Sequence, residues 1–542
     1  MATPARRTRQ HGRRWQAAVL GGLLLVAAAC GGDDDTSAPG TTASTTSTGA
    51  TGERTCPRDP AGTRLTMGTV FEVAGLDPTV AFGSGQSGQS ELHAIYDALM
   101  RYVPETRTYE PHVAASLTPN DDRTEWTLVL RDGIRFGNGD PLTAEAVRYS
   151  LERLGRTTRF AAGQVQEIAS MEVVDDLTLR LTMRRPNGQL AYTLSGEAGM
   201  VVNPRLAEER GEGLATDPNG AGVGPFEVER FAPGEELVLR AKDDYWGGPV
   251  CLETLRFVRV GASQASWEAF QAGELDVAFL EDDPRVIAEA RADGKEVYAS
   301  VAAGGSMLNL NNREGRPTAD PRVRRAIAHA IDVDLLARRL FGDAGVGGTT
   351  VTSPEQPAWG GVEGIRADAD TARRLVAEAK ADGWDGRLGM VFSNTPFETD
   401  LSIALEGMLE AVGMDVEREN LPPNAALERL LQPPYDYDVA RAQLAVLDTG
   451  GFARLNQFLS DSVRNRTGYG SPDMDAAILE LLAASDVEEE AAAYGRIQEI
   501  WNRDVPSVPL LTTSWSIIAQ DHVGGLAFTT EAAILWHGAY VD

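Results

Sequence analysis

The residues that could do chemistry are not spaced as the common catalytic motifs require. The stretch "FGSGQSGQSE" comes nearest to the GxSxG turn of a serine hydrolase, but Gln89 stands where the closing glycine is needed. Gly294 and Lys295 are followed by Glu296, which argues against a phosphate-binding loop. No HExxH pair and no zinc-binding cysteine spacing occurs, and the histidines stand at positions 11, 93, 112, 329, 522 and 537. These patterns predict a protein that is not an enzyme and holds no metal or cofactor, although the paired carboxylates of a glycosidase would leave no such pattern.

Cys30 ends an N-terminal segment that is typical of an export signal. Residues 1–29 carry five arginines and no acid, and the apolar stretch 17–30 is 14 residues long, short of the ~20 that a membrane-spanning helix needs. The three alanines at 27–29 run into Cys30, and this junction resembles the lipobox of bacterial lipoproteins. The resemblance implies that residues 1–29 are a cleaved signal peptide and that lipidated Cys30 holds the protein at the outer face of the cell membrane. An ordinary cleavage that leaves Cys30 unmodified is the alternative, and the arginine pair at 13–14 leaves twin-arginine export open beside general secretion.

Residues 30–55 predict a disordered tether. They contain no aromatic and no branched aliphatic residue, so they have too little apolar surface to fold. Behind an acylated cysteine, such a tether would hold a globular body clear of the membrane surface.

The net charge argues against a nucleic-acid-binding protein. The formal charge is −29, and removal of the five arginines in residues 1–29 would lower it to −34. A strongly negative body repels nucleic acid and anionic lipid headgroups. The same charge also serves solubility, so it identifies no partner by itself.

Cys56 and Cys251 remain as a pair once Cys30 is assigned to lipid. Disulfides persist in the oxidising compartments that exported proteins reach. A bond between the two would close a loop of nearly 200 residues, for which the loss of chain entropy gives roughly 5 kcal/mol. The sequence favours this disulfide, with two free buried thiols as the alternative.

The chain from Cys56 onward is too long for one hydrophobic core. Its length of about 490 residues predicts two or more lobes. Period-two alternation predicts half-buried strands within 124–136 and 177–185. Helical and strand patterns mix without a strict βαβ rhythm, which indicates a multi-lobed α/β or α+β protein.

Two helices are well marked by their ends. The pattern predicts one helix over 140–155, capped by Thr143. It predicts a longer one over 320–342, capped by Asp320, with an apolar face made of Val323, Ile327, Ile331 and Leu335. His329 falls opposite that face and is expected to be a solvated surface residue.

Blocks of sequence follow one another in a recognisable order. The most specific is "EWTLVLRDGIRFGNGDPLTAEAVRYSLER" at 125–153, a strand, a tight loop and a helix start. The others include "FQAGELDVAF" and stand at 76–118, 222–246, 270–279, 308–332 and 491–511. Over residues 64–542 the chain resembles the extracellular solute-binding proteins of family 5, the dipeptide- and oligopeptide-binding components of ABC importers.

The resemblance implies an α/β fold of two lobes joined by hinge strands, of the periplasmic-binding-protein type (type II, cluster C). The first lobe is discontinuous in the family. Projected here, lobe I covers residues 56–304 and lobe II residues 305–514, and residues 515–542 return to lobe I. Cys56 and Cys251 both fall in lobe I, which strengthens the expectation of a disulfide.

The resemblance also implies candidate ligand contacts. Asp448, in "LAVLDTGGF", stands where peptide-binding relatives place a carboxylate that meets the α-amine of the ligand. Residues 443–444 replace the usual Gly-Trp, and the Asp-Pro that normally follows is missing, so a non-peptide ligand stays open. Met307, near the hinge crossing, is a further candidate, with packing as the alternative. A loop that lines the cleft in relatives corresponds to Ser84, Gly85 and Gln86, for which a plain glycine–serine turn is the alternative.

The function implied by the resemblance is capture of peptides or similar small solutes by lobe closure and their delivery to permease and ATPase subunits. The protein is expected to act as a monomer and to make or break no bond. Alternatives are a receptor for a non-peptide solute (a nickel chelate, an oligosaccharide or an opine), a sensory receptor and a secreted hydrolase.

Overall fold

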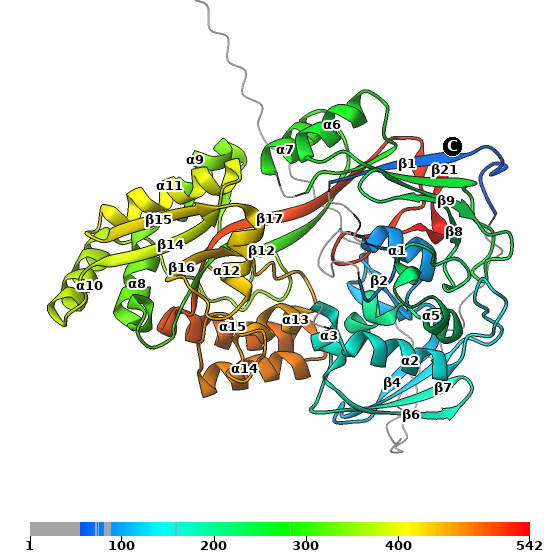
Figure 1. Cartoon of the computed structure of the whole chain (residues 1–542), viewed down its shortest axis with the longest axis horizontal. Helices are drawn as coiled ribbons and strands as arrows, with labels where there is room; N and C mark the ends of the chain where they lie inside the picture. The colour runs from blue at the N-terminus through cyan, green and yellow to red at the C-terminus, as the bar shows by residue number, and fades with distance from the viewer. Residues whose placement is uncertain (1–54, 71–72, 74, 81–87, 158–159, 282) are drawn as a thin grey trace, which may run out of the picture. The chain divides into compact units, whose positions relative to one another are not determined.

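A large mixed sheet organises the described part of the chain, which comprises residues 55–70, 73, 75–80, 88–157, 160–281 and 283–542 of a computed structural model (Figure 1). Its 11 strands run in the order β15-β14-β16-β12-β17-β11-β1-β10-β9-β8, with β13 paired to β17. In that order they span Asp415–Leu421, Arg387–Ser393, Val439–Ala442, Val297–Leu310, Ser507–Ala519, Val277–Phe279, Arg64–Thr69, Thr254–Arg259, Glu236–Ala241 and Phe226–Ala232, and β13 spans Val346–Gly347. Cys30, Ser84, Gly85 and Gln86 lie outside the described residues.

Smaller sheets and many helices complete the fold. A four-stranded sheet has the order β4 (Ala114–Pro119), β5 (Glu125–Leu130), β7 (Thr178–Met183) and β6 (Ile168–Asp175). Two-stranded pairs are β2 (Met100–Val103) with β3 (Thr108–Pro111), β18 (Val523–Gly524) with β21 (Tyr540–Val541), and β19 (Ala527–Phe528) with β20 (Ile534–Leu535). The α-helices are α1 Gln89–Tyr96, α2 Ala144–Gly155, α3 Phe160–Val165, α4 Leu190–Thr193, α5 Pro204–Arg210, α6 Ser263–Gln271, α7 Pro284–Ala292, α8 Pro321–Ala330, α9 Val333–Phe341, α10 Ala369–Ala381, α11 Pro396–Glu410, α12 Pro423–Leu431, α13 Gly451–Leu455, α14 Pro472–Ala483 and α15 Val487–Asp504. Among the described residues, no helix combines the length and the apolar character that crossing a membrane requires.

The hydrophobic cores divide along the chain. Three clusters draw on residues 65–290 and 517–541, and two others draw on residues 303–511. A small cluster joins Ala302, Ala445, Leu447 and Trp515. This division parallels the ranges expected for lobe I (56–304 and 515–542) and lobe II (305–514); the boundaries stay a prediction, and we keep both names for these ranges.

Several local predictions are confirmed. The two predicted strands are β5 and β7, which pair antiparallel and bury alternate side chains. The first predicted helix is α2, and the Thr143 side chain accepts a hydrogen bond from the Ala146 amide, as an N-cap does. Hydrophobic periodicity and cap chemistry were therefore sufficient signals for these elements.

The prediction of one helix over 320–342 is wrong. Asp320 caps α8 as expected, but the helix ends at Ala330 and Ile331 is extended. A second helix, α9, begins after Asp332, whose side chain accepts from the Leu335 amide and so caps a new start. Leu335 is consequently exposed, and His329 is half-buried with Nδ1 3.0 Å from the carbonyl oxygen of Arg366.

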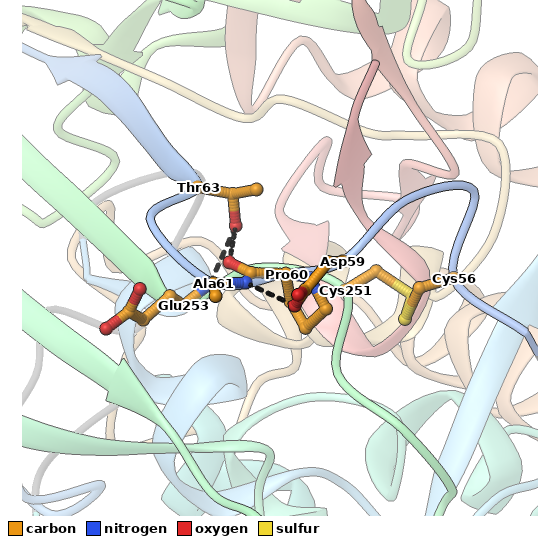
Figure 2. Close-up of a disulfide and its surroundings, with 7 residues drawn as sticks. All are labelled: Cys56, Asp59, Pro60, Ala61, Thr63, Cys251 and Glu253. Atoms are coloured by element: carbon orange, nitrogen blue, oxygen red, sulfur yellow. Dashed lines mark hydrogen bonds between the residues drawn. A yellow bond between two sulfur atoms is a disulfide. The ribbon is translucent and has the colours of Figure 1, made fainter.

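A disulfide joins Cys56 to Cys251, with their Cα atoms 5.2 Å apart (Figure 2). Cys56 precedes β1 and Cys251 precedes β10, and these two strands pair in parallel from Arg64 opposite Thr254. Between the disulfide and the paired strands, the Glu253 amide donates a hydrogen bond of 2.9 Å to Thr63 Oγ1 (Figure 2). The bond thus holds the first strand of lobe I beside a partner that lies far along the chain.

Helix α1 is wholly buried and carries two ionisable side chains, Glu91 and His93. Burial raises the pKa of Glu91 to about 7. Burial also lowers the pKa of His93 to about 4, although the negative charge of Asp97 acts in the opposite direction. Both groups are therefore neutral in the folded protein between these two values.

These two groups are expected to give opposite dependences of stability on pH. Glu91 binds more protons folded than unfolded, so its contribution is lost as pH rises from 4.5 to about 7. His93 binds fewer protons folded, so its contribution is lost as pH falls from 6.5 to about 4. Removing the carboxylate with Glu91→Gln should therefore make the free energy of unfolding rise by about 3 kcal/mol more than in the wild type between pH 4.5 and 7.

Urea unfolding at both pH values measures this difference. His93→Gln is the matched control and should give the opposite change of slope. Equal slopes in the wild type and Glu91→Gln would contradict the assignment.

Candidate functional site

Two long strands, β12 and β17, connect the lobe ranges (Figure 1). They pair antiparallel along their length, but the register shifts between Ala302 and Ser306. Gly304 there has φ +60°, and a Cβ on Gly305 would lie 1.9 Å from Thr513 Oγ1. Glycine is therefore required where the strands pass from one range to the other.

Met307 lies just beyond this crossing and is fully buried. It is paired with Ala442 on one side and Pro509 on the other, within the core of lobe II. This burial is explained by packing in the core of lobe II. It gives no support to the expected contact between Met307 and a ligand.

Asp448 lies in the loop that follows β16, and this loop is tied to the hinge crossing. The backbone groups of Val446 and Ala303 exchange two hydrogen bonds of 3.0 Å. The Asp448 side chain is half-buried, and burial raises its pKa despite the positive charge of Arg107 and a hydrogen bond with Gln356. A cationic group on a ligand could form a charge-assisted hydrogen bond with this carboxylate and so stabilise its charged form.

The negative charge of Asp448 acts on Tyr102 and Tyr298 of lobe I and on Tyr494 of lobe II. Burial and then the charge of Asp448 raise the pKa of Tyr102 to about 12. Burial, Tyr102 and then Asp448 raise the pKa of Tyr298 as well. The Tyr298 ring stacks on Phe528 at 3.9 Å between centroids. The site therefore combines one carboxylate with apolar ring surfaces, a composition usual in small-molecule sites.

Next to Asp448, the lobe ranges touch. Thr449 Oγ1 is hydrogen-bonded to the Tyr109 hydroxyl, and a Cβ on Gly450 would lie 2.3 Å from Cζ of Tyr192. Arg454 pairs with Glu531 at 2.8 Å. We call the contacts of residues 449, 450 and 454 with residues 109, 192 and 531 the interlobe wall.

A small cavity lies beside the interlobe wall, within lobe I. Its volume is about 30 Å³, which holds a water molecule or two and excludes a peptide. Its polar lining residues are Gln89, Gln164, Tyr192, Thr193, Ser195, Glu197, Thr529, Thr530 and Glu531. Within the described ranges, no group of three or more His, Cys, Asp or Glu residues could hold a metal ion.

Asp448 as a ligand contact stays a prediction from the sequence, and the residues near it were not predicted. Tyr102, Tyr192, Tyr298 and Glu531 come from four separate segments, and none belongs to a motif with fixed spacing. A single sequence carries no signal for such a set, because only the fold brings it together.

The sequence comparisons give the family. The profile of the bacterial extracellular solute-binding proteins, family 5 (middle part), matches residues 108–464. The chain belongs to this family. Family 5 proteins are extracytoplasmic, and the resemblance of the sequence blocks is thereby confirmed.

Proteins similar to this chain match it over most of their length. The probable D,D-dipeptide-binding periplasmic protein DdpA of Escherichia coli is 24% identical, with 86% of this chain and 91% of the relative aligned. Oligopeptide-binding OppA of Haemophilus influenzae, solved with the peptide RPPGFSPFR, has a TM-score of 0.74 at 19% identity over 90% of this chain and 100% of that chain. AgaA of Agrobacterium tumefaciens, solved with agropinic acid, has a TM-score of 0.73 at 20% identity over 88% and 99%. These structures confirm the predicted two-lobed binding-protein fold.

Proposed function

We propose that this family 5 protein captures peptides between its lobes and delivers them to the permease and ATPase subunits of an ABC importer. The observation that carries the proposal is Asp448, a half-buried carboxylate whose pKa is raised by burial and whose charge acts on Tyr102 and Tyr298. A free α-amine supplies the positive charge and donors that this carboxylate accepts. The similarity to DdpA and OppA, both named as peptide-binding, supports the same ligand class.

Lobe closure would couple binding to delivery. Ligand contacts with both lobes favour the closed state by their difference in affinity for the two states. The glycines at the β12–β17 crossing support lobe I (56–304 and 515–542) and lobe II (305–514) as the moving parts. In this proposal the protein acts as a monomer and catalyses no reaction.

Anchoring by lipidated Cys30 completes the proposal. The basic, apolar and small-residue order of residues 1–29 supports cleavage before Cys30. Palmitate labelling of the wild type and of Cys30→Ser tests it, and label that persists in the variant would contradict it.

A non-peptide solute is the second candidate. The departures around Asp448 and the similarity to AgaA, solved with agropinic acid, favour it. Native mass spectrometry of the purified protein with its co-captured ligand decides between the two. A mixture of peptides supports the first candidate, and a single small metabolite overturns it.

Asp448→Asn tests the role of the carboxylate. We expect it to weaken peptide binding about 10- to 100-fold, because a charged hydrogen bond contributes about 1.5–3 kcal/mol. Binding by the wild type should also weaken toward mildly acidic pH, because the raised pKa of Asp448 makes it protonate earlier than an ordinary aspartate. Calorimetric titration measures both effects, with exposed Asp400→Asn as control. Unchanged affinity in Asp448→Asn would exclude the assignment.

A further inference from the structure

Arg454 and Glu531 form a buried ion pair between the two lobe ranges. Arg454 Nη2 lies 2.8 Å from Glu531 Oε1, and the side chains are 9% and 8% exposed. Arg454 belongs to α13 of lobe II, and Glu531 lies in the turn between β19 and β20 of lobe I. This contact exists only while the two ranges touch.

Glu531 is held in place from lobe I. Gln89 Nε2 donates to Oε2 at 2.9 Å, and the Tyr192 hydroxyl donates to Oε1 at 3.2 Å. Its turn is fixed by a hydrogen bond of 2.5 Å from Ser300 Oγ to the carbonyl oxygen of Thr530. Both carboxylate oxygens thus accept from protein groups, which favours a structural contact over a contact with ligand.

Arg454 also packs against an aromatic ring of lobe I, that of Trp515. Its guanidinium carbon lies 5.5 Å from the centroid of the Trp515 ring. The start of α13 is in direct contact with lobe I, because a Cβ on Gly450 would lie 2.3 Å from Cζ of Tyr192. The neighbouring cavity of about 30 Å³ has room for water only. The pair therefore closes this end of the interlobe wall.

Burial makes each charge depend on the other. When two opposite charges are buried together, their attraction offsets part of the desolvation cost. A single buried charge has no such compensation. Separation of the lobe ranges would take Arg454 away from Glu531 and leave Glu531 with its lobe I partners, Gln89 and Tyr192. A contact that is present in only one of two states shifts the equilibrium toward that state.

We propose that Arg454 and Glu531 are positioning residues that hold the closed state together and thereby retain ligand without touching it. This inference rests on the proposed function, since retention has meaning only for a protein that closes on a ligand. It assigns these two side chains a role that the Asp448 contact does not have.

The test is a double-mutant cycle with Arg454→Gln, Glu531→Gln and the double variant of the full chain. The substitutions Glu209→Cys in lobe I and Asp370→Cys in lobe II introduce sites for spin labels; the native side chains are 66% and 95% exposed. Pulsed electron resonance between the labels then measures the closed fraction of the ligand-free protein. Each single variant should lower the ratio of closed to open molecules at least ~10-fold. The double variant should lose less than the two single losses combined, because it buries no lone charge, but it should stay below the wild type, because it lacks the pair.

Dissociation of the peptides recovered from the wild-type protein gives the second readout. Dissociation should accelerate in each single variant and in the double variant, but in the double by less than the product of the two single effects. The exposed pair Arg374–Glu378 supplies the control variant Arg374→Gln, which should change neither readout. Single variants that close normally, a double variant that closes as the wild type does, or single effects that simply add in the double variant would overturn the proposal. Absence of peptide binding with the closure pattern intact would instead refute the proposed ligand class.

Discussion

Replacing Cys251 by serine is expected to lower the free energy of unfolding by about 5 kcal/mol. The bond with Cys56 closes a loop with a sequence separation of 195, and the entropy that such a loop removes from the unfolded chain corresponds to about 5 kcal/mol at 25 °C. Loss of the disulfide should also weaken the attachment of β1, which lies between β10 and β11 in the large sheet. Guanidinium unfolding followed by circular dichroism measures the change.

Reduction provides the matched control for this prediction. Dithiothreitol should destabilise the wild type by a similar amount and leave the Cys56→Ser/Cys251→Ser double variant unchanged. A double variant as stable as the oxidised wild type would show that the bond does not stabilise the native state.

Local elements could be predicted from the sequence because their determinants are local. The alternation of Leu179, Leu181 and Met183 identifies β7, and Thr143 identifies the start of α2. The same logic failed at Ile331, where an apolar residue continues the helical stripe although the backbone is extended. The cap at Asp332 competes with helix continuation, and a stripe of side chains carries no information on which wins.

The site could be predicted only in part, for a different reason. Asp448 is predicted from its place in a family motif, whereas Glu531 reaches the interlobe wall from the C-terminal segment. Contacts across such sequence distances depend on the topology of the large sheet, in which β12 and β17 bring the two lobe ranges together. Spacing along the chain does not encode that arrangement.

A second interlobe contact is formed at the C-terminal end of α14. The last carbonyl groups of a helix lack partners within it, and here lobe I supplies them. The carbonyl oxygen of Leu482 accepts from the Gly188 amide at 2.8 Å, and that of Leu481 accepts from Gln189 Nε2 at 3.1 Å. The carbonyl oxygen of Ala483 accepts from Arg123 Nη1 at 3.1 Å. The positive charge of Arg123 also suits the negative end of the helix dipole.

This approach requires glycine at position 188. A Cβ there would lie 1.9 Å from the carbonyl oxygen of Ala484 and 3.0 Å from that of Ala483. Both oxygens belong to backbone, which cannot move aside as the end of a side chain can. Gly188→Ala should therefore leave each lobe folded and selectively oppose their contact.

We expect Gly188→Ala to weaken ligand binding about 10- to 100-fold, because overpacking by one methyl group costs about 1–3 kcal/mol and acts here only on the closed state. The loss should appear as faster dissociation, with an unchanged unfolding midpoint in the absence of ligand. Stopped-flow release of the peptides recovered from the wild type measures it. Gly213→Ala is the control, since a Cβ at Gly213 would meet no atom within 4 Å. Equal release rates for Gly188→Ala and Gly213→Ala would mean that ligand is held without contact between α14 and lobe I, and that the interlobe wall alone defines closure.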